Sequence, residues 1–226
     1  MKKIALLISL ITLINVCGAF GAEPVDVVKN SAKKLGGKAG YSWTSTSSGK
    51  PEIRMGPLEG KAEKNGFTYC KFTFADNQIE TAFKGTKSAL NREGQWESAE
   101  ELEASNAAIA RRLKDFKAPV AEAEDLADKA KNLHGDTEGL YSGELSPEGV
   151  KEVLSRWRRT EASGTKGTIK FWIKNGLLTK YEYNVQGTVT GSDQNEVEID
   201  RTTTVEIKDV GATKVSVPEE AKKKLS

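Results

Sequence analysis

The hydrophobic positions along the first third of the chain change from a helical to an extended period. Over residues 25–35 they recur every three or four positions, and Gly36 follows at once. From residue 41 to residue 85 they alternate with a period of two, which is typical of strands with one buried face. Asn65-Gly66 and Asp76-Asn77 separate alternating runs and favour tight turns. The pattern predicts a short amphipathic helix and then a meander of antiparallel strands with the sequences YSWTSTS, GPLEGKAE, FTYCKFTF and QIETAFKG.

The middle of the chain returns to helical spacing. Ser98 and Glu101 form a capping-box pattern at the start of this region. The apolar stripe of the helix that follows consists of Leu102, Ile109, Leu113 and Phe116. Pro119 ends this helix, because proline cannot continue a helix interior. A second helix is expected beyond it, with inward apolar residues as far as Leu133.

A third helix is predicted to begin at Pro147, with Ser146 as its N-cap. The three helices form an insert over about residues 98–157. Beyond the insert the period of two returns, with a strong hairpin turn signal at residues 174–176. The order helix, strands, helices, strands, helical tail indicates an α+β fold with an antiparallel sheet. The lysine-rich end is expected to be a frayed, solvated tail.

Residues of the last three predicted strands divide between two faces of the sheet. The apolar face carries Ile169, Phe171, Ile173, Leu177, Tyr181, Tyr183, Val185, Val189, Val197, Ile199, Val205 and Ile207. The residues between them are mostly charged or amide side chains, so the second face meets water. Strands this long curve by their natural twist, and Gly187 is expected to allow a kink. The expected architecture is a curved antiparallel sheet that forms an incomplete β-barrel, closed by amphipathic helices.

The apolar face is also the candidate ligand site, because a filled core and an apolar cavity use the same residue types. The residues expected to line such a cavity are Phe171, Leu177, Tyr181, Tyr183, Val185, Ile199, Arg201, Val205, Ile109 and Leu113. Arg201 either faces a lipid head group or a lid helix, or it marks a bulge, a register change or a strand-end salt bridge. Tyr181 and Tyr183 are either core aromatics with hydroxyls at the rim or contacts for a ligand.

Residues 1–21 have the pattern of a secretory signal peptide, with two lysines, a short apolar run and then small residues. Cleavage is expected after Gly21, with Ala22 as the alternative. Val16 precedes Cys17 where a lipoprotein signal has a small residue, which disfavours a lipid anchor. No later segment is expected to span a membrane. The predicted location is therefore the periplasm or the extracellular medium.

The mature chain has no net charge. Removing the leader takes away Lys2 and Lys3 and no acid, which leaves 34 − 2 = 32 basic side chains against 32 acidic ones. A neutral chain argues against nucleic acid as a partner, since binding it needs a basic surface. Cys70 is the only cysteine after the leader, so no intramolecular disulfide is expected despite export. A single domain is predicted over residues 22–226.

Catalytic motifs are missing from the sequence. There is no nucleophile elbow, paired-cysteine spacing, glycine-rich phosphate loop or zincin motif. The single histidine, His134, has Asp136 nearby, but a lone histidine after a helix is typical of a helix end. A well-placed pair of carboxylates, which is all that a glycoside hydrolase needs, stays open among the 32 acids. The protein is expected not to be an enzyme and to hold no metal or cofactor.

The order of elements and several segments are similar to those of a known family. The segments are the leader, the short first helix, the meander ending in GQW, the helical insert, GTIKFWIKNGLLTKYEYNVQGTVTG, VEIDRTTTVEIKDV and VSVPEEAKKKL. Together they resemble the LolA-like superfamily of periplasmic lipoprotein carriers and LppX- and LprG-like lipid-binding proteins. The resemblance implies a periplasmic carrier whose apolar cavity holds lipid or lipoprotein acyl chains, with envelope donor and acceptor proteins as partners. The alternative is a ligand-free structural or protein-interaction module of the cell envelope.

Overall fold

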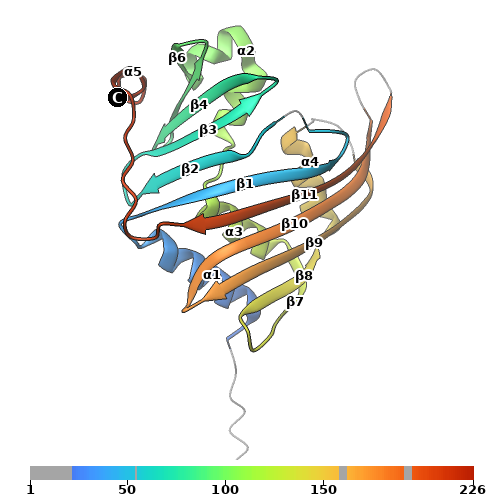
Figure 1. Cartoon of the computed structure of the whole chain (residues 1–226). Coiled ribbons are helices and arrows are strands. Elements are labelled where there is room, and N and C mark those ends of the chain that lie inside the picture. Colours follow the sequence, from blue (N-terminus) through green and yellow to red (C-terminus); the bar gives the residue numbers. More distant parts are fainter. Residues whose placement is uncertain (1–21, 54, 158–161, 191–194) are drawn as a thin grey trace, which may run out of the picture.

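The computed structural model describes residues 22–53, 55–157, 162–190 and 195–226. The predicted signal peptide, including Cys17, lies outside these residues. Within them the chain forms the predicted α+β fold with a large antiparallel sheet (Figure 1).

Eleven strands form one open antiparallel sheet in the described part of the chain. They are β1 (Gly40–Lys50), β2 (Leu58–Glu63), β3 (Thr68–Phe74), β4 (Asn77–Lys84), β5 (Lys87–Arg92), β6 (Gln95–Ser98), β7 (Ala130–Gly135), β8 (Leu140–Leu145), β9 (Ala162–Lys174), β10 (Leu177–Thr190) and β11 (Glu196–Lys208). Their order is β6-β5-β4-β3-β2-β1-β11-β10-β9-β8-β7. Two meanders, β1 to β6 and β7 to β11, are therefore joined where β1 pairs with β11, and the edges of the sheet are β6 and β7.

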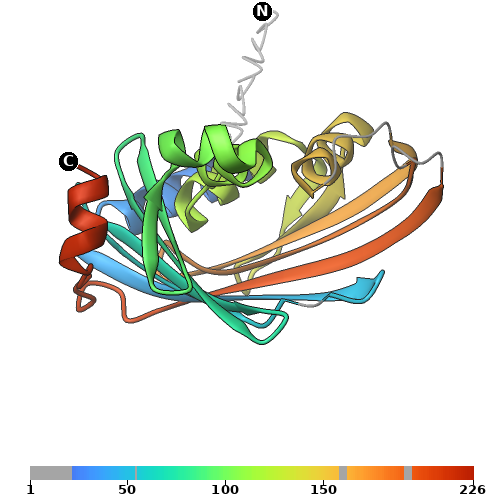
Figure 2. The same ribbon diagram turned by 90° about the horizontal axis from the view of Figure 1, so that it is seen from above.

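The helices of the described residues are α1 (Pro24–Gly36), α2 (Ala99–Lys114), α3 (Pro119–Asp128), α4 (Pro147–Trp157) and α5 (Glu219–Lys224). Figure 2 shows α1 to α4 on the concave side of the curved sheet. Helices α1 and α3 pack together, and α1 also lies on β10, while α4 covers β9 and β10 and α2 covers β5 and β6. The helical layer thus has α2 at one end and α4 at the other.

Local sequence explains where the helices of the concave layer begin. Helix α2 starts with the predicted capping box, in which Ser98 Oγ accepts from the Glu101 amide and Glu101 accepts from the Ser98 amide. Pro119 starts α3, and Ser146 Oγ accepts from the Gly149 amide at the start of α4. Helix α2 is bent at Asn106, whose φ of −152° and ψ of 74° are not helical. The predicted helix starts are therefore confirmed.

The main core lies between the concave face and helices α1, α3 and α4. Its largest fully buried side chains include Tyr181, Phe171, Leu35, Leu126, Ile169, Leu178, Val28, Val150, Val153, Val185 and Val189. A second cluster on the same face joins Leu90 of β5 to Leu102 and Leu113 of α2. The concave face is thus filled by the protein's own helices over β9 and β10.

The C-terminal segment does not form the predicted frayed tail. Ala221 and Leu225 pack with Ala82, Ala89 and Trp96 in a third cluster. Because these strand residues alternate with those that face α2, helix α5 covers the convex face of β4 to β6. The short N-terminal strands are therefore held between α2 and α5, a docking contact that local propensity does not reveal.

The second predicted helix is shorter than expected. Helix α3 ends at Asp128, and residues 130–135 form β7 instead of continuing the helix toward Leu133. Pairing with β8 supplies backbone hydrogen bonds that outweigh the local helical spacing. The register of this pairing shifts between Lys131 and His134, with Asn132 at a φ of 53°. The insert therefore contains a β-hairpin between its helices.

Strand parity near the start of β10 differs from the prediction at one position. The register of β10 against β9 shifts between Leu178 and Lys180, so Leu178 is fully buried while Leu177 is half-buried at the margin of the same core. A second shift lies at Gly187, where the kink was predicted. Beyond Lys180 the predicted alternation is confirmed, with Tyr181, Tyr183 and Val185 buried.

A Gly60→Ala substitution tests the packing of the concave face. A Cβ at Gly60 would lie 2.1 Å from the Trp43 indole, which is buried against the glycine. We expect the indole to shift and the free energy of unfolding to fall by about 1–3 kcal/mol. Denaturant unfolding followed by tryptophan fluorescence measures both effects. Gly56→Ala is the control, because its Cβ would meet nothing closer than 3.6 Å. Equal losses of unfolding free energy in the two variants would contradict close packing of Trp43 on Gly60.

Candidate ligand site

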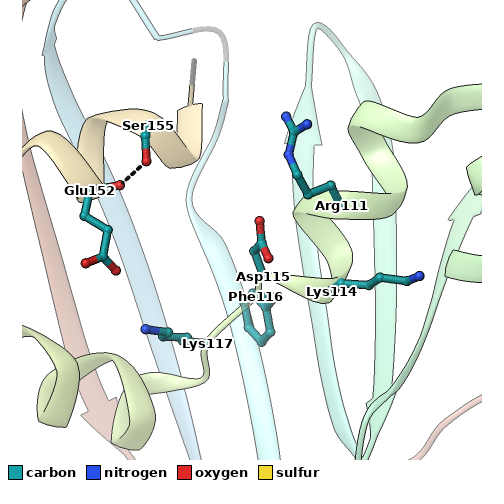
Figure 3. A pocket seen from close by; sticks show the side chains of 7 residues that line it. All are labelled: Arg111, Lys114, Asp115, Phe116, Lys117, Glu152 and Ser155. Carbon is teal, nitrogen blue, oxygen red and sulfur yellow. Dashed lines mark hydrogen bonds between the residues drawn. The ribbon is translucent and has the colours of Figure 1, made fainter. Parts of the chain in front are cut away.

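A cleft of about 580 Å³ opens between the two ends of the helical layer (Figure 3). It is lined by the end of α2, the connection from α2 to α3, and one side of α4. The lining residues are Arg111, Lys114, Asp115, Phe116, Lys117, Glu152 and Ser155. Its volume falls in the range of about 300–1,000 Å³ that is typical of ligand sites.

Four charged side chains on one side of the cleft form a connected group. Asp125 lies 2.8 Å from Lys117 and 2.5 Å from Lys129, and Lys129 lies 3.1 Å from Glu152. Lys129 and Asp125 are the least exposed members. Two cations face two anions, so this group carries no net charge. It ties the connection after α2 to α3 and α4.

The charged side chains at the end of α2 differ in whether they form an ion pair. Lys114 pairs with Glu103 at 2.5 Å, a hydrogen bond that raises the pKa of Lys114, and it projects away from the other lining residues in Figure 3. Arg111 is half-buried and Asp115 is exposed. Among the described residues, neither of these two side chains makes an ion pair or a side-chain hydrogen bond. One cation and one anion therefore remain available in the cleft.

Phe116 connects the charged cleft to the concave face of the sheet. Its ring stacks on Phe83 of β4, with a centroid distance of 4.3 Å and an interplanar angle of 16°. Phe83 and Ile79 share one face of β4, and Ile79 pairs with Phe72 of β3. Phe116 therefore joins the cleft to Phe83, which packs against both the main core and the cluster under α2.

A set of partly exposed apolar side chains lies along β2 to β4 on the concave face of the sheet. We call it the concave strip, and it consists of Met55, Leu58, Phe72, Phe74 and Ile79. Phe72 and Phe74 have the same parity as buried Cys70, which places them on the concave face. Phe74 is 53% exposed and Met55 is 39% exposed, and the two form an isolated β-bridge. These are unusually accessible positions for such side chains.

Most of the predicted cavity residues lie in the main core. Buried there are Phe171, Tyr181, Tyr183, Val185, Ile199 and Val205, with Leu177 at its margin. Ile109 and Leu113 lie apart from them, in the cluster between α2 and β5. Arg201 is half-buried on the concave side of β11, opposite Val185 and Gly49. The structure thus brings the sheet residues together and separates them from the two residues of the insert.

The two tyrosines of β10 contact one of the protein's own helices. The Tyr181 hydroxyl donates to Glu122 of α3 at 2.6 Å, and the Tyr183 hydroxyl donates to the same carboxyl group at 3.4 Å. Burial, followed by the proximity of Glu122, raises the pKa of Tyr181 well above its ordinary value. A hydrogen bond from a buried hydroxyl satisfies a polar group that the core would otherwise leave without water. These contacts hold α3 on the sheet.

The cleft residues were not among those predicted from the sequence. Phe116 was assigned to the helical stripe, yet it lies just past the end of α2 and faces the cleft. No sequence pattern singles out Arg111 or Asp115, because which charged side chains lie near them is visible only in three dimensions. Glu122 carried no signal either, since its tyrosine partner is 59 residues away in the chain.

The structure gives the lone histidine and its neighbour separate roles. His134 Nδ1 lies 3.1 Å from the Asn132 carbonyl oxygen, and Nε2 lies 3.2 Å from Ser142 Oγ across the β7–β8 pair. Asp136 accepts hydrogen bonds from backbone amides of its own turn. His134 ends a strand here and not a helix, which corrects the predicted setting. Within the described ranges, no three histidine, cysteine or acidic residues gather as a metal site would require.

Comparison with known proteins gives one structural match to report. No family model matches the chain, and no curated protein matches it. A crystal structure of LprF from Mycobacterium bovis is similar at 12% identity, with a TM-score of 0.49, over 89% of this chain and 98% of that chain. This similarity concerns the fold and assigns no ligand to this chain. In the part of the chain that the structure describes, no helix has the length and apolar character needed to cross a membrane.

A Tyr181→Phe substitution tests the link between β10 and α3. Loss of a hydrogen bond to a carboxyl group is expected to lower the free energy of unfolding by about 1–3 kcal/mol. Because the folded state holds the Tyr181 proton more tightly than the unfolded chain, its contribution is complete below the ordinary pKa of 10.0 and is lost as the pH rises above it. The variant should therefore lose stability less steeply than the wild type between about pH 9 and pH 11.

Urea unfolding at several pH values measures this dependence. Tyr183→Phe is the control, since its bond to Glu122 is 3.4 Å long and should contribute less. If the free energy of unfolding falls more steeply at alkaline pH in the Tyr181 variant than in the wild type, the proposed role of the Tyr181 hydroxyl is wrong.

Cys70 is expected to be inert toward thiol reagents in the folded protein. Its side chain is fully buried, and burial raises the pKa of the thiol to about 12. The thiolate that reacts is therefore scarce at neutral pH and shielded from solvent. At pH 8 a chromogenic disulfide reagent should react only after unfolding by denaturant. Rapid reaction with the native mature chain would show that the Cys70 side chain on β3 is accessible to solvent.

Proposed function

We propose that the mature protein binds the acyl chain of a lipid or lipoprotein along the concave strip and carries it in the exported compartment. The supporting observation is the strip itself, whose exposed members Met55 and Phe74 lie on the concave face of the sheet. An amphiphile has an apolar chain, which suits the strip, and a polar end, which suits the charged cleft. Single exposed apolar side chains are normal, but a contiguous group on a concave face is typical of a binding surface.

The helices set the extent of the proposed acyl site. Over β9 and β10 the concave face is filled by α1, α3 and α4, so the predicted cavity residues there act mainly as core. Tyr181 and Tyr183 hold α3 in this arrangement through Glu122. The acyl chain therefore lies first on β2 to β4, from Phe74 toward Phe116. Val205, also predicted to line the cavity, is buried in that core, and Arg201 is half-buried on the same strand.

A carrying function fits the chemistry of the described residues better than catalysis. The strip offers apolar contacts, and the cleft offers charges, but no nucleophile and base approach each other there. Binding without covalent change requires only burial of the chain, at about 25 cal/mol per Å² of apolar surface. Export, which the leader predicts, places such a carrier where envelope lipids are available.

A Phe74→Asp substitution tests the acyl site. Phe74 is 53% exposed, so the change should leave folding intact while it places a charge on the strip. Loss of one large apolar contact, about 1.5 kcal/mol, corresponds to roughly ten-fold weaker binding of a fluorescent acyl probe. Fluorescence titration of the mature chain measures this effect. Val210→Asp is the matched control, because Val210 is 37% exposed and lies beyond β11, off the strip.

Two results would overturn the proposal. One is the absence of any acyl-probe binding by the wild type, together with a clean apo mass by native mass spectrometry. The other is an equal loss of binding in the Phe74 and Val210 variants. Recovery of a stable protein partner that protects the strip, without bound lipid, would favour the interaction module instead.

A further inference from the structure

The cleft holds two opposite charges that the protein does not use for itself. Lys117, Asp125, Lys129 and Glu152 neutralise one another, and Lys114 pairs outside the cleft with Glu103. Arg111 and Asp115 remain, and no ion pair joins either of them to another described residue. Among the described side chains of the cleft, these contacts leave one separate cation and one separate anion.

The position of Asp115 is electrostatically unfavourable for the free protein. It is the C-cap residue of α2, and the negative end of the helix dipole disfavours a carboxylate there. Arg111 lies one turn earlier, at the spacing where opposite charges on a helix commonly pair. In Figure 3 both side chains project toward the same side of the cleft without meeting. A ligand that carries two opposite charges has a partner for each of these groups.

We propose that the cleft binds a zwitterionic head group that carries a phosphate and a primary amine, on the lipid whose acyl chain lies along the concave strip. This inference rests on the proposed function and names the class of its ligand. The Arg111 guanidinium donates paired hydrogen bonds to the phosphate oxygens. Asp115 accepts hydrogen bonds from the ammonium group. Phe116 follows Asp115 in the chain and lines the same cleft, and its ring stacks on Phe83 of the sheet.

Other head groups fit these charges less well. A purely anionic head group would pair with Arg111 but would lie beside Asp115 and Glu152, and like charges repel at such distances. A neutral head group would shield both Arg111 and Asp115 from water and give neither a counter-charge. A head group with both signs of charge gives Arg111 and Asp115 each a counter-charge.

Lipids that share the same acyl chains separate head-group recognition from acyl-chain binding. Phosphatidylethanolamine, phosphatidylglycerol and diacylglycerol, each with one acyl-linked fluorophore, are titrated into the wild-type mature chain at low salt. Because a partly exposed ion pair contributes up to about 1 kcal/mol, we expect phosphatidylethanolamine to bind about five-fold more tightly than the other two. Glycerophosphoethanolamine, which lacks acyl chains, should compete only weakly, which distinguishes the lipid from a free phosphate compound.

Two variants assign the recognition to single side chains. Asp115→Asn should reduce phosphatidylethanolamine binding to the level of phosphatidylglycerol, and Arg111→Gln should reduce both to the level of diacylglycerol. Asp128→Asn is the control for the first, since Asp128 also ends a helix but pairs with Lys29 away from the cleft. Arg92→Gln is the control for the second, because Arg92 lies on β5 beside Glu97.

The outcomes separate the two proposals. Equal binding of all three lipids by the wild type overturns the head-group site and leaves acyl-chain binding intact. Tighter binding of phosphatidylglycerol than of phosphatidylethanolamine also overturns it, because Asp115 would then face no ligand cation. Binding of none of the lipids overturns the proposed function, and the head-group site with it. Unchanged lipid preference in both cleft variants would assign the recognition to other residues and contradict the proposal.

Discussion

The pairing of β1 with β11 is the interaction on which the rest of the structure depends. From Ser42 opposite Lys208 to Lys50 opposite Asp200, this ladder joins a meander from the first half of the chain to one from the second half. Its partners are at least 150 residues apart in sequence, so closing the ladder costs chain entropy that local contacts do not offset. Without it, two short sheets would each expose an edge. With it, a single curved face exists for the helices to cover.

The helices cover that face unevenly and so divide it between buried core and partly exposed side chains. Tyr181 and Tyr183 fix α3 through a single carboxyl group, and α4 packs against the far end of β9 and β10. Helix α2 belongs to a different cluster and is bent at Asn106. The connection that follows it carries Phe116 into the space between the two clusters. Phe116 thus lies where the two parts of the helical layer separate.

Features set by local chemistry could be predicted from the sequence, and features set by distant partners could not. The hairpin turns, the Ser98 capping box and the alternation beyond Lys180 were predicted because neighbouring residues specify them. The bulge that buries Leu178, the strand pairing of residues 130–135 and the docking of α5 on Trp96 depend on residues far away. The same distinction holds in the candidate site. Tyrosines on a long apolar strand were visible, whereas Glu122 and the cleft residues are defined only by their surroundings.

The irregular outer strand of the sheet has a consequence for the behaviour of the protein in concentrated solution. A regular edge strand exposes a row of amides and carbonyls on which another sheet can extend. On β7 the left-handed residue Asn132 and the register shift beside it interrupt that row, and β6 at the opposite edge is only four residues long. An open sheet of eleven strands therefore avoids edge-to-edge polymerisation without having to close on itself.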